Sequence, residues 1–219
     1  MDGRIIQGLY GIADLGYRPE LSLRQKIDAF LSGGASVVQV RAKDRPAREL
    51  FDGTRLALEL AAGKALVVVN DRPDVAMAAG ADGVHVGAED LPVAEVRRIV
   101  GPQMIVGATA RTLVDARAAI AAGADYVGFG PVYPTSTKEL AVEARGLQRL
   151  AEVVRGLGAP VVAIGGITLD RAEAVARAGA AAVAVVSDVL GAAEPAARAR
   201  EFSLALARGQ ALARSVEAS

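Results

Sequence analysis

The 219-residue chain has no cysteine and no tryptophan, one histidine, and only 4% aromatic residues. The absence of cysteine excludes disulfides, thiolate nucleophiles and cysteine-ligated metals, and it fits a reducing cytoplasm. Because aromatic residues are scarce while apolar residues make up 52% of the chain, the core must consist of Ala, Val, Leu and Ile. Such a core is typical of layered α/β proteins, in which helices lie close to a sheet.

The chain also lacks a charge imbalance, since 25 Lys and Arg residues face 25 Asp and Glu residues. A net charge of zero provides no field that would favour nucleic acid or an anionic membrane as a partner. No uninterrupted apolar run reaches the roughly 18 residues of a membrane span, and the start, MDGRIIQGLY, lacks the apolar centre of a signal peptide. We expect a cytoplasmic protein with one domain, residues 1–219, for which a homo-oligomer is possible.

A repeated pattern is present instead. The segments LSGGASVVQV, MAAGADGVHV, AAGADYVGF and RAGAAAVAVV each read as a helix end, a Gly-Ala pair and a strand. The second glycine of each helix end supplies the left-handed conformation that terminates a helix; these are Gly34, Gly80, Gly123 and Gly179. Four more strands are expected from nearly continuous apolar runs, which are typical of parallel strands covered on both faces: Ile5–Ala13, Ala65–Asp71, Ile105–Ala110 and Val161–Gly166.

Eight strands with helical patterns between them predict a single compact (β/α)8 TIM barrel, with about 25–30 residues in each unit. The alternative is a doubly wound open sheet, but the first turn, LYGIADLGY, has no GxGxxG phosphate loop. Residues 191–219, rich in Ala and Arg, are expected to form a C-terminal helix or tail. In such a barrel the active site lies at the carboxyl ends of the strands, so polar residues there are the candidates.

The second strand ends in VVQVRAKD, which places Gln39, Arg41 and Lys43 at alternate positions. Alternate residues of a strand point to one face, and the lumen is the expected face because Val38 and Val40 then point to the helices. Polar groups inside a barrel are costly unless they bind something. A solvated polar rim is the alternative interpretation.

Two further strands end at a carboxylate. Asn70 and Asp71 end one strand, and Asp90 follows the strand at Gly83–Gly87. Neighbouring carboxylates repel, and Mg²⁺, which binds one or two carboxylates together with substrate phosphates, would remove that penalty. The sequence therefore predicts a magnesium site at Asp71 and Asp90. Alternatively, Asp90 caps the helix that follows and Asp71 is a solvated loop residue.

Two loops suit phosphate. GFGPVYPTSTK brings hydroxyls and a lysine together, at Thr135, Ser136, Thr137 and Lys138, although a plain surface turn is the alternative. AIGGI and VAVVSD follow the seventh and eighth strands, where barrels often bind phosphate through backbone N–H groups. The residues of this second set are Gly165, Gly166, Val186 and Ser187.

Together these residues form two anion-binding ends. Arg41, Lys43, Lys138 and a metal on two carboxylates suit a diphosphate, whereas the backbone N–H groups and hydroxyls suit a monophosphate. Two phosphorylated small-molecule substrates, with diphosphate departing, would explain both ends. No activated nucleophile is visible, which favours direct transfer with electrostatic stabilisation of the leaving group. Thr109 could offer a hydroxyl to a ligand, and His85 is expected to be a packed, hydrogen-bonded residue rather than a catalyst.

The pieces VVQVRAKD, VVVNDRPDVAMAAGADGVHVGAED, GATART, GADYVGFGPVYPTSTK, AIGGIT and VSDVL together resemble the thiamine phosphate synthase family. They occur in the family's order and span Leu9 to about Leu190. The resemblance implies a Mg²⁺-dependent, dissociative alkyl transfer. In it, 4-amino-2-methyl-5-(diphosphooxymethyl)pyrimidine and thiazole phosphate give thiamine phosphate and diphosphate.

The resemblance also implies roles for individual residues. The pyrimidine diphosphate site would comprise Gln39, Val40, Arg41, Ala42, Lys43, Asn70, Thr109 and Lys138, with Arg41, Lys43 and Lys138 catalytic. The thiazole phosphate site would comprise Thr135, Ser136, Thr137, Gly166, Val186 and Ser187, and the metal ligands would be Asp71 and Asp90. The chain departs from the family pattern in having Ala88 for Gln, Thr109 for Ser and Arg111 for His.

Two alternative functions stay open. A thiazole tautomerase-like barrel is expected to rely on histidine chemistry and to lack the paired carboxylates, which fits poorly with His85 as the sole histidine. A non-catalytic binder of thiamine precursors would not need Asp71, Asp90 and Lys138, because binding alone does not require a clamp on a leaving group. Diphosphate release separates these functions.

Overall fold

The computed structural model describes residues 5–135 and 143–217, and the calls on Ser136, Thr137 and Lys138 lie outside these ranges. Eight parallel strands hydrogen-bond in chain order and close into a barrel, with β1 next to β8. The strands are β1 (Gly8–Asp14), β2 (Val37–Arg41), β3 (Leu66–Asn70), β4 (Gly83–Val86), β5 (Ile105–Ala110), β6 (Tyr126–Phe129), β7 (Val161–Ile164) and β8 (Ala182–Val185). The predicted TIM barrel is confirmed, and the open sheet is wrong.

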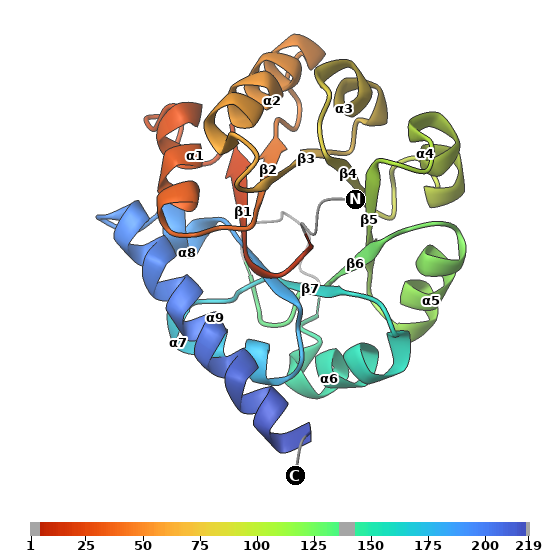
Figure 1. Ribbon diagram of the computed structural model, residues 1–219, viewed down its shortest axis with the longest axis vertical. Helices are drawn as coiled ribbons and strands as arrows, with labels where there is room; N and C mark the ends of the chain where they lie inside the picture. Colours follow the sequence, from red (N-terminus) through yellow and green to blue (C-terminus); the bar gives the residue numbers. More distant parts are fainter. Residues whose placement is uncertain (1–4, 136–142, 218–219) are drawn as a thin grey trace.

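Helices form a ring around the barrel (Figure 1). They are α1 (Leu23–Ser32), α2 (Ala47–Ala61), α3 (Pro73–Ala79), α4 (Val93–Val100), α5 (Leu113–Ala121), α6 (Gly146–Leu157), α7 (Leu169–Arg177), α8 (Ser187–Leu190) and α9 (Pro195–Glu217). The long α9 packs across the outside of α7 and α1, near the point where the barrel closes. Within the described ranges, no helix combines the length and the apolar character needed to cross a membrane.

The strand ends differ slightly from those expected. β1 begins at Gly8, where pairing with Ala182 of β8 starts, and it continues to Asp14, which pairs with Arg41. β3 stops before Asp71, whose φ of 64° leaves the extended region, and β7 stops before the two glycines of AIGGI for the same reason. Each strand therefore ends where the backbone turns into a loop of the barrel mouth.

Glycine ends four helices as expected. Gly34, Gly80, Gly123 and Gly179 all have positive φ, between 74° and 104°. A side chain is disfavoured in this region, so glycine allows the chain to turn directly into the next strand. The repeated Gly-Ala pattern in the sequence is therefore the structural junction between each of these helices and a strand.

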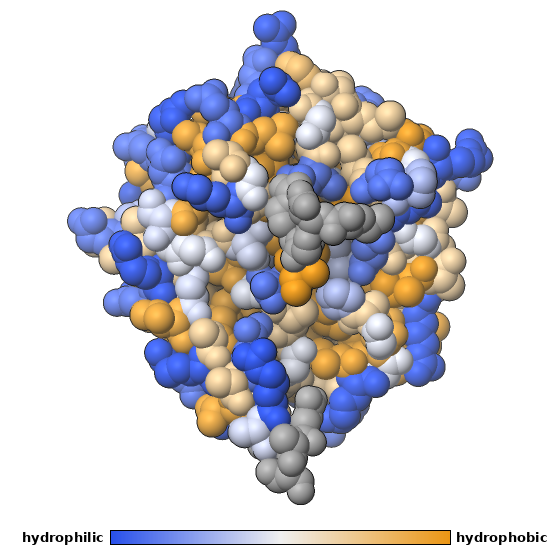
Figure 2. Space-filling view, viewed as in Figure 1, coloured by the Kyte–Doolittle hydropathy of each residue, from blue (hydrophilic) through white to orange (hydrophobic). Residues whose placement is uncertain are grey.

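The core has two layers. The larger lies between the strands and the helices and is built almost entirely of aliphatic side chains and alanine. The smaller fills the barrel itself and includes Tyr10, Ile12, Val68, Tyr126 and Val162. On the outside, hydrophilic residues stand out around the edge of the face shown in Figure 2, with hydrophobic residues between them.

Candidate active site

The alternation predicted for the second strand is confirmed. The side chains of Val38 and Val40 are buried in the layer between barrel and helices, and neither is exposed to solvent. Gln39 points into the lumen, where its side-chain nitrogen lies 2.8 Å from the hydroxyl of Tyr10. Because Val40 points away from the mouth, it can contribute only main-chain atoms to a ligand site there.

Arg41 is held by an acid that the sequence analysis missed. Its guanidinium forms an ion pair with the carboxylate of Asp14, at the end of the neighbouring strand β1. The other oxygen of this carboxylate accepts a hydrogen bond from Gly16 N at 2.7 Å. Below it, the buried Lys26 donates to the carbonyls of Asp14 and Tyr17, at 2.9 and 2.6 Å. Arg41 therefore stands on a fixed support at the mouth.

Asp71 and Asp90 lie close enough to influence each other's charge. Burial, and next the neighbouring Asp90 carboxyl, raise the pKa of Asp71 to about 6. Lys43 and Arg41 oppose this rise, and Lys43 Nζ lies 4.0 Å from Asp71 Oδ2. The mouth thus combines two neighbouring carboxylates with two cationic side chains, as predicted from the strand ends.

The alternative interpretation of Asp90 as a helix cap is wrong. The N-cap of α4 is Pro92, and no side chain caps that helix. Instead, the carboxylate of Asp90 turns back and accepts a hydrogen bond from Gly87 N at 2.7 Å. This contact fixes the turn after β4, and the Asp90 carboxyl is also a neighbour of Asp71.

These residues fit a magnesium ion. Oxygen ligands are what Mg²⁺ prefers, and one or two carboxylates with substrate phosphates are its usual protein ligands. Burial first, and then the neighbouring Asp90 carboxyl, raise the pKa of Asp71, as expected where two carboxyls share a partly buried site. In the described part of the chain, no cluster of three or more His, Cys, Asp or Glu residues offers a different kind of metal site.

A chain of hydrogen bonds crosses the lumen below the mouth. The hydroxyls of Tyr10 and Tyr126 lie 2.9 Å apart, and both side chains are buried. His85 Nδ1 lies 3.1 Å from the Tyr126 hydroxyl, and His85 Nε2 lies 3.1 Å from the Thr109 hydroxyl. His85 is therefore hydrogen-bonded inside the barrel as expected. The chain joins Gln39 on β2 to Thr109 on β5.

The rings of Tyr126 and His85 fit in the lumen because two glycines leave room for them. A Cβ at Gly107 would lie 2.1 Å from the ring of Tyr126, and one at Gly128 would lie 3.0 Å from the ring of His85. Asn70, at the end of β3, pairs with His85 on β4 and so lies beside the same site. The glycines thus let aromatic rings fill the lumen directly beneath the mouth.

On the opposite side, the loop after β6 packs onto the loop after β7. Tyr133 N donates to the carbonyl of Gly165 at 3.0 Å. A Cβ at Gly166 would lie 2.3 Å from the carbonyl oxygen of Pro134 and 2.8 Å from that of Tyr133. Arg171 donates to the carbonyl of Gly166 at 2.7 Å and lies over the ring of Tyr133. Gly166 is therefore needed for the packing of these two loops.

The remaining predicted residues lie at the same end of the barrel. Thr135 is half-buried at the last described position of its loop, and Ala42 follows β2. Val186 is the N-cap of α8, and the exposed Ser187 begins that helix. The structure thus gathers the described candidates around one mouth, with Asp14, Tyr10 and Tyr126 as additions. The signal for Tyr10 and Asp14 was the period-two series Tyr10, Ile12, Asp14 on β1.

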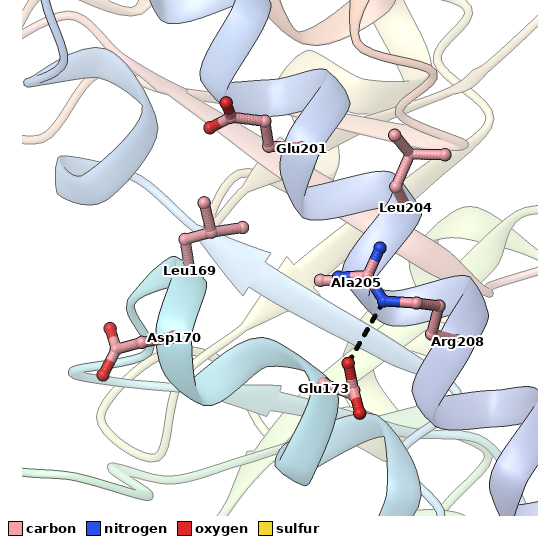
Figure 3. A pocket seen from close by; sticks show the side chains of 7 residues that line it. All are labelled: Leu169, Asp170, Glu173, Glu201, Leu204, Ala205 and Arg208. Carbon is pink, nitrogen blue, oxygen red and sulfur yellow. Dashed lines mark hydrogen bonds and ion pairs between the residues drawn. The ribbon is translucent and has the colours of Figure 1, made fainter.

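A cavity of about 380 Å³ lies elsewhere, between α7 and α9. Its lining is Leu169, Asp170, Glu173, Glu201, Leu204, Ala205 and Arg208. The Nε of Arg208 and the carboxylate of Glu173 form an ion pair across it at 3.2 Å (Figure 3). It lies outside the helix ring rather than at the strand ends, and we assign it no part in the reaction.

If Gly166 borders a thiazole phosphate, as the family resemblance implies, Gly166→Ala should impair the use of that substrate selectively. The new Cβ would displace the loop at Tyr133 and Pro134, so the Michaelis constant for thiazole phosphate should rise by about tenfold or more. The constant for the pyrimidine diphosphate should stay within about twofold. Gly158→Ala is the matched control, because Gly158 also has positive φ but a Cβ there has no neighbour within 4 Å. Equal effects on both substrates would contradict the division into two ends.

A closed (β/α)8 barrel with acidic and cationic side chains gathered at the carboxyl ends of its strands has the architecture of a TIM-barrel enzyme. The chain belongs to the thiamine monophosphate synthase family, which matches residues 9–189. The family predicted from the sequence motifs is therefore confirmed, as is the prediction that the chain is an enzyme.

Individual relatives agree with this assignment. The chain is 58% identical over 146 residues to a thiamine-phosphate synthase from Anaeromyxobacter dehalogenans, covering 67% of this chain and 66% of that protein. It is 48% identical over 164 residues to one from Myxococcus xanthus, covering 74% and 75%. Its fold matches the thiamine phosphate pyrophosphorylase of Pyrococcus furiosus with a TM-score of 0.85 and 36% identity, covering 94% and 98%.

Proposed function

We propose that the chain condenses 4-amino-2-methyl-5-(diphosphooxymethyl)pyrimidine with thiazole phosphate to give thiamine phosphate and diphosphate, with the help of Mg²⁺. The observation that carries this proposal is the pair Asp71 and Asp90, whose neighbouring carboxyls lie beside Lys43 and Arg41. Family membership supports it. Binding alone would not require repelling carboxylates next to cations, whereas a departing diphosphate with its metal requires both charges.

In the proposed reaction the bond between the pyrimidine methylene carbon and the diphosphate oxygen breaks, and the electron pair leaves with oxygen. The 4-amino group donates electron density to the positive methylene. The lone pair of the thiazole nitrogen then forms the new C–N bond, and no proton has to be removed. Direct transfer of this kind needs charge stabilisation and positioning rather than a nucleophilic side chain.

The chain's own residues have separate tasks in this proposal. Arg41 and Lys43 bind the diphosphate, and Lys138 is assigned to the same task from the sequence alone. Asp71 and Asp90 would hold Mg²⁺, which when bound would neutralise charge on the leaving diphosphate. Thr135, Ser136, Thr137, Gly166, Val186 and Ser187 would bind the thiazole phosphate. A cytoplasmic location, which the lack of cysteine favours, stays part of the proposal.

An omission assay tests the proposal. Purified protein with Mg²⁺ and both substrates should form thiamine phosphate, detected by mass spectrometry, and omission of thiazole phosphate should abolish it. A tautomerase would convert the thiazole phosphate without releasing diphosphate. A non-catalytic binder would bind either substrate and form no product. Either of these results would overturn the proposal.

The raised pKa of Asp71 predicts a pH-dependent response to magnesium. The native carboxyl, with a pKa of about 6, holds its proton more tightly than the unfolded chain does near pH 3.9. Stability without metal should therefore fall as the pH rises from about 4 to about 6 and stay reduced above that. Added Mg²⁺ with diphosphate should raise the thermal midpoint little near pH 5 and most above about pH 7. A midpoint shift that is independent of pH would contradict this account.

A further inference from the structure

The hydrogen bonds beneath the mouth have linked directions. A tyrosine hydroxyl has one proton and can donate one hydrogen bond. Because the side-chain nitrogen of Gln39 faces Tyr10 and can only donate, the Tyr10 proton remains for the hydroxyl of Tyr126. The Tyr126 proton then goes to His85 Nδ1. The direction of every bond thus follows from the orientation of one amide.

Counting protons in the same way fixes the donor and acceptor roles at His85 and Thr109. When His85 Nδ1 accepts, the ring proton of the neutral imidazole is on Nε2, which donates to the Thr109 hydroxyl. In this arrangement the hydroxyl proton of Thr109 is not used by His85, so it can be donated to another acceptor. The side-chain nitrogen of Gln39 is used by Tyr10, so the acceptor that this amide has left for a ligand is its carbonyl oxygen. Burial raises the pKa of Tyr10 and of Tyr126, so both keep their protons.

We propose that Tyr10 and Tyr126 are positioning residues that set substrate specificity, because through His85 they hold Gln39 as an acceptor and Thr109 as a donor toward the pyrimidine. This inference rests on the proposed function. An amino group that faces Gln39 donates to its carbonyl oxygen, and a ring nitrogen that faces Thr109 accepts its proton. An oxo group in place of the amino group would bring two acceptors face to face at Gln39.

The tyrosines matter because they prevent Gln39 from adapting. A glutamine amide can turn over and exchange its donor for its acceptor. Here, turning over would reverse each bond as far as Thr109 and would move the histidine proton to Nδ1. Such a reversal must change the hydrogen bonds of five buried or half-buried groups together. The site therefore disfavours the oxo ring, whereas a glutamine without these partners would accept either ring.

The direction of these hydrogen bonds can be measured without substrate, from the nitrogen of His85 that carries the proton. His85 is the only histidine, so ¹⁵N NMR of the wild-type protein reports one imidazole ring. The expected tautomer carries its proton on Nε2, with Nδ1 unprotonated. A proton on Nδ1, alone or together with one on Nε2, would overturn the assigned polarity.

The role of the tyrosines in specificity is tested with Tyr126→Phe. The Tyr126 hydroxyl bonds to Tyr10 and His85 rather than to Gln39, so the substitution acts on Gln39 only indirectly. The wild-type enzyme should prefer the 4-amino substrate over its 4-oxo analogue by about 10³-fold in kcat/KM. The variant should lose at least about tenfold of this preference, mainly because the Michaelis constant of the 4-oxo analogue falls once Gln39 can turn over. Thr54→Val, which removes a buried hydroxyl within α2, is the control and should keep the preference. Tyr10→Phe provides the same test if Tyr126→Phe does not fold.

The outcomes are distinguishable. A wild-type protein that forms no thiamine phosphate refutes the proposed function, and the inference with it. An active wild type with a proton on Nε2 and an unchanged preference in both tyrosine variants refutes the role of the tyrosines alone. Reduced preference in these variants, with the control unchanged, supports it.

Discussion

Asp71→Asn is expected to lower activity by at least about 10²-fold, because a bound metal supplies several kcal/mol of charge stabilisation. Asparagine keeps the shape of the side chain but offers a neutral amide instead of a carboxylate. Packing should therefore survive while the response to Mg²⁺ is lost. The measurement is kcat against MgCl₂ concentration, and the thermal midpoint with and without Mg²⁺ and diphosphate.

Asp90→Asn should separate two effects, the repulsion between the carboxylates without metal and the binding of Mg²⁺. Above about pH 6 the variant without metal should be more stable than wild type, because the repulsion by Asp90, which adds to the effect of burial on the pKa of Asp71, is removed. Its activity and its Mg²⁺ response should nevertheless fall as in Asp71→Asn. The amide oxygen can still accept from Gly87 N, so the turn is kept. Asp52→Asn, on the exposed face of α2, is the control and should behave like wild type. Full activity in either site variant would remove that residue from the metal site.

Arg41→Ala is the second change with a large expected effect. Loss of one preorganised cation at the leaving group should lower kcat by about 10²–10³. It also leaves the carboxylate of Asp14, whose side chain is only 10% exposed, without its partner, so the thermal midpoint should fall. Arg48→Ala, which removes an exposed arginine from α2, should change neither quantity.

Variants of Asp14 show whether this residue acts only by holding Arg41 in place or independently of Arg41. If Asp14 acts only by holding Arg41, Asp14→Asn should reduce activity by about tenfold, less than Arg41→Ala, and Asp14→Asn combined with Arg41→Ala should be no worse than Arg41→Ala alone. Unchanged activity in Arg41→Ala would show that this arginine does not bind the diphosphate. Additive losses in the double variant would show that Asp14 acts independently of it.

The fold was predictable because its signals are local. Gly-Ala pairs at Gly34, Gly80, Gly123 and Gly179 mark the helix ends, and each has the positive φ that the pattern requires. Nearly continuous apolar runs mark strands that are buried on both faces. Such signals need only a few neighbouring residues, so they survive without knowledge of the tertiary structure.

Much of the site was predictable for a related reason. Parallel strands in a barrel all end at one mouth, so polar residues at strand ends must lie near one another. This placed Arg41, Lys43 and Asp71 together before any geometry was known. The resemblance to a known family then gave a role to Asn70 and Thr109, whose residue types alone are too common at strand ends to indicate one.

The rest depended on contacts that no local pattern encodes. Tyr10 and Tyr126 are 116 positions apart, and only closure of the barrel brings their hydroxyls together. Asp14 was missed because the expected strand ended one residue earlier, at Ala13. The alternative interpretation of Asp90 as a helix cap is wrong because its carboxylate accepts from Gly87 N in the turn after β4, a contact that the pattern of the following helix does not reveal.

The most direct test of the proposed function is a ³¹P NMR time course of the wild-type protein with both substrates and Mg²⁺. We expect inorganic diphosphate and thiamine phosphate to appear in equal amounts, and we expect both to stop appearing when EDTA removes the metal. If no diphosphate is released in the presence of both substrates, or if release continues undiminished after EDTA, Mg²⁺-assisted transfer between two phosphorylated substrates is contradicted.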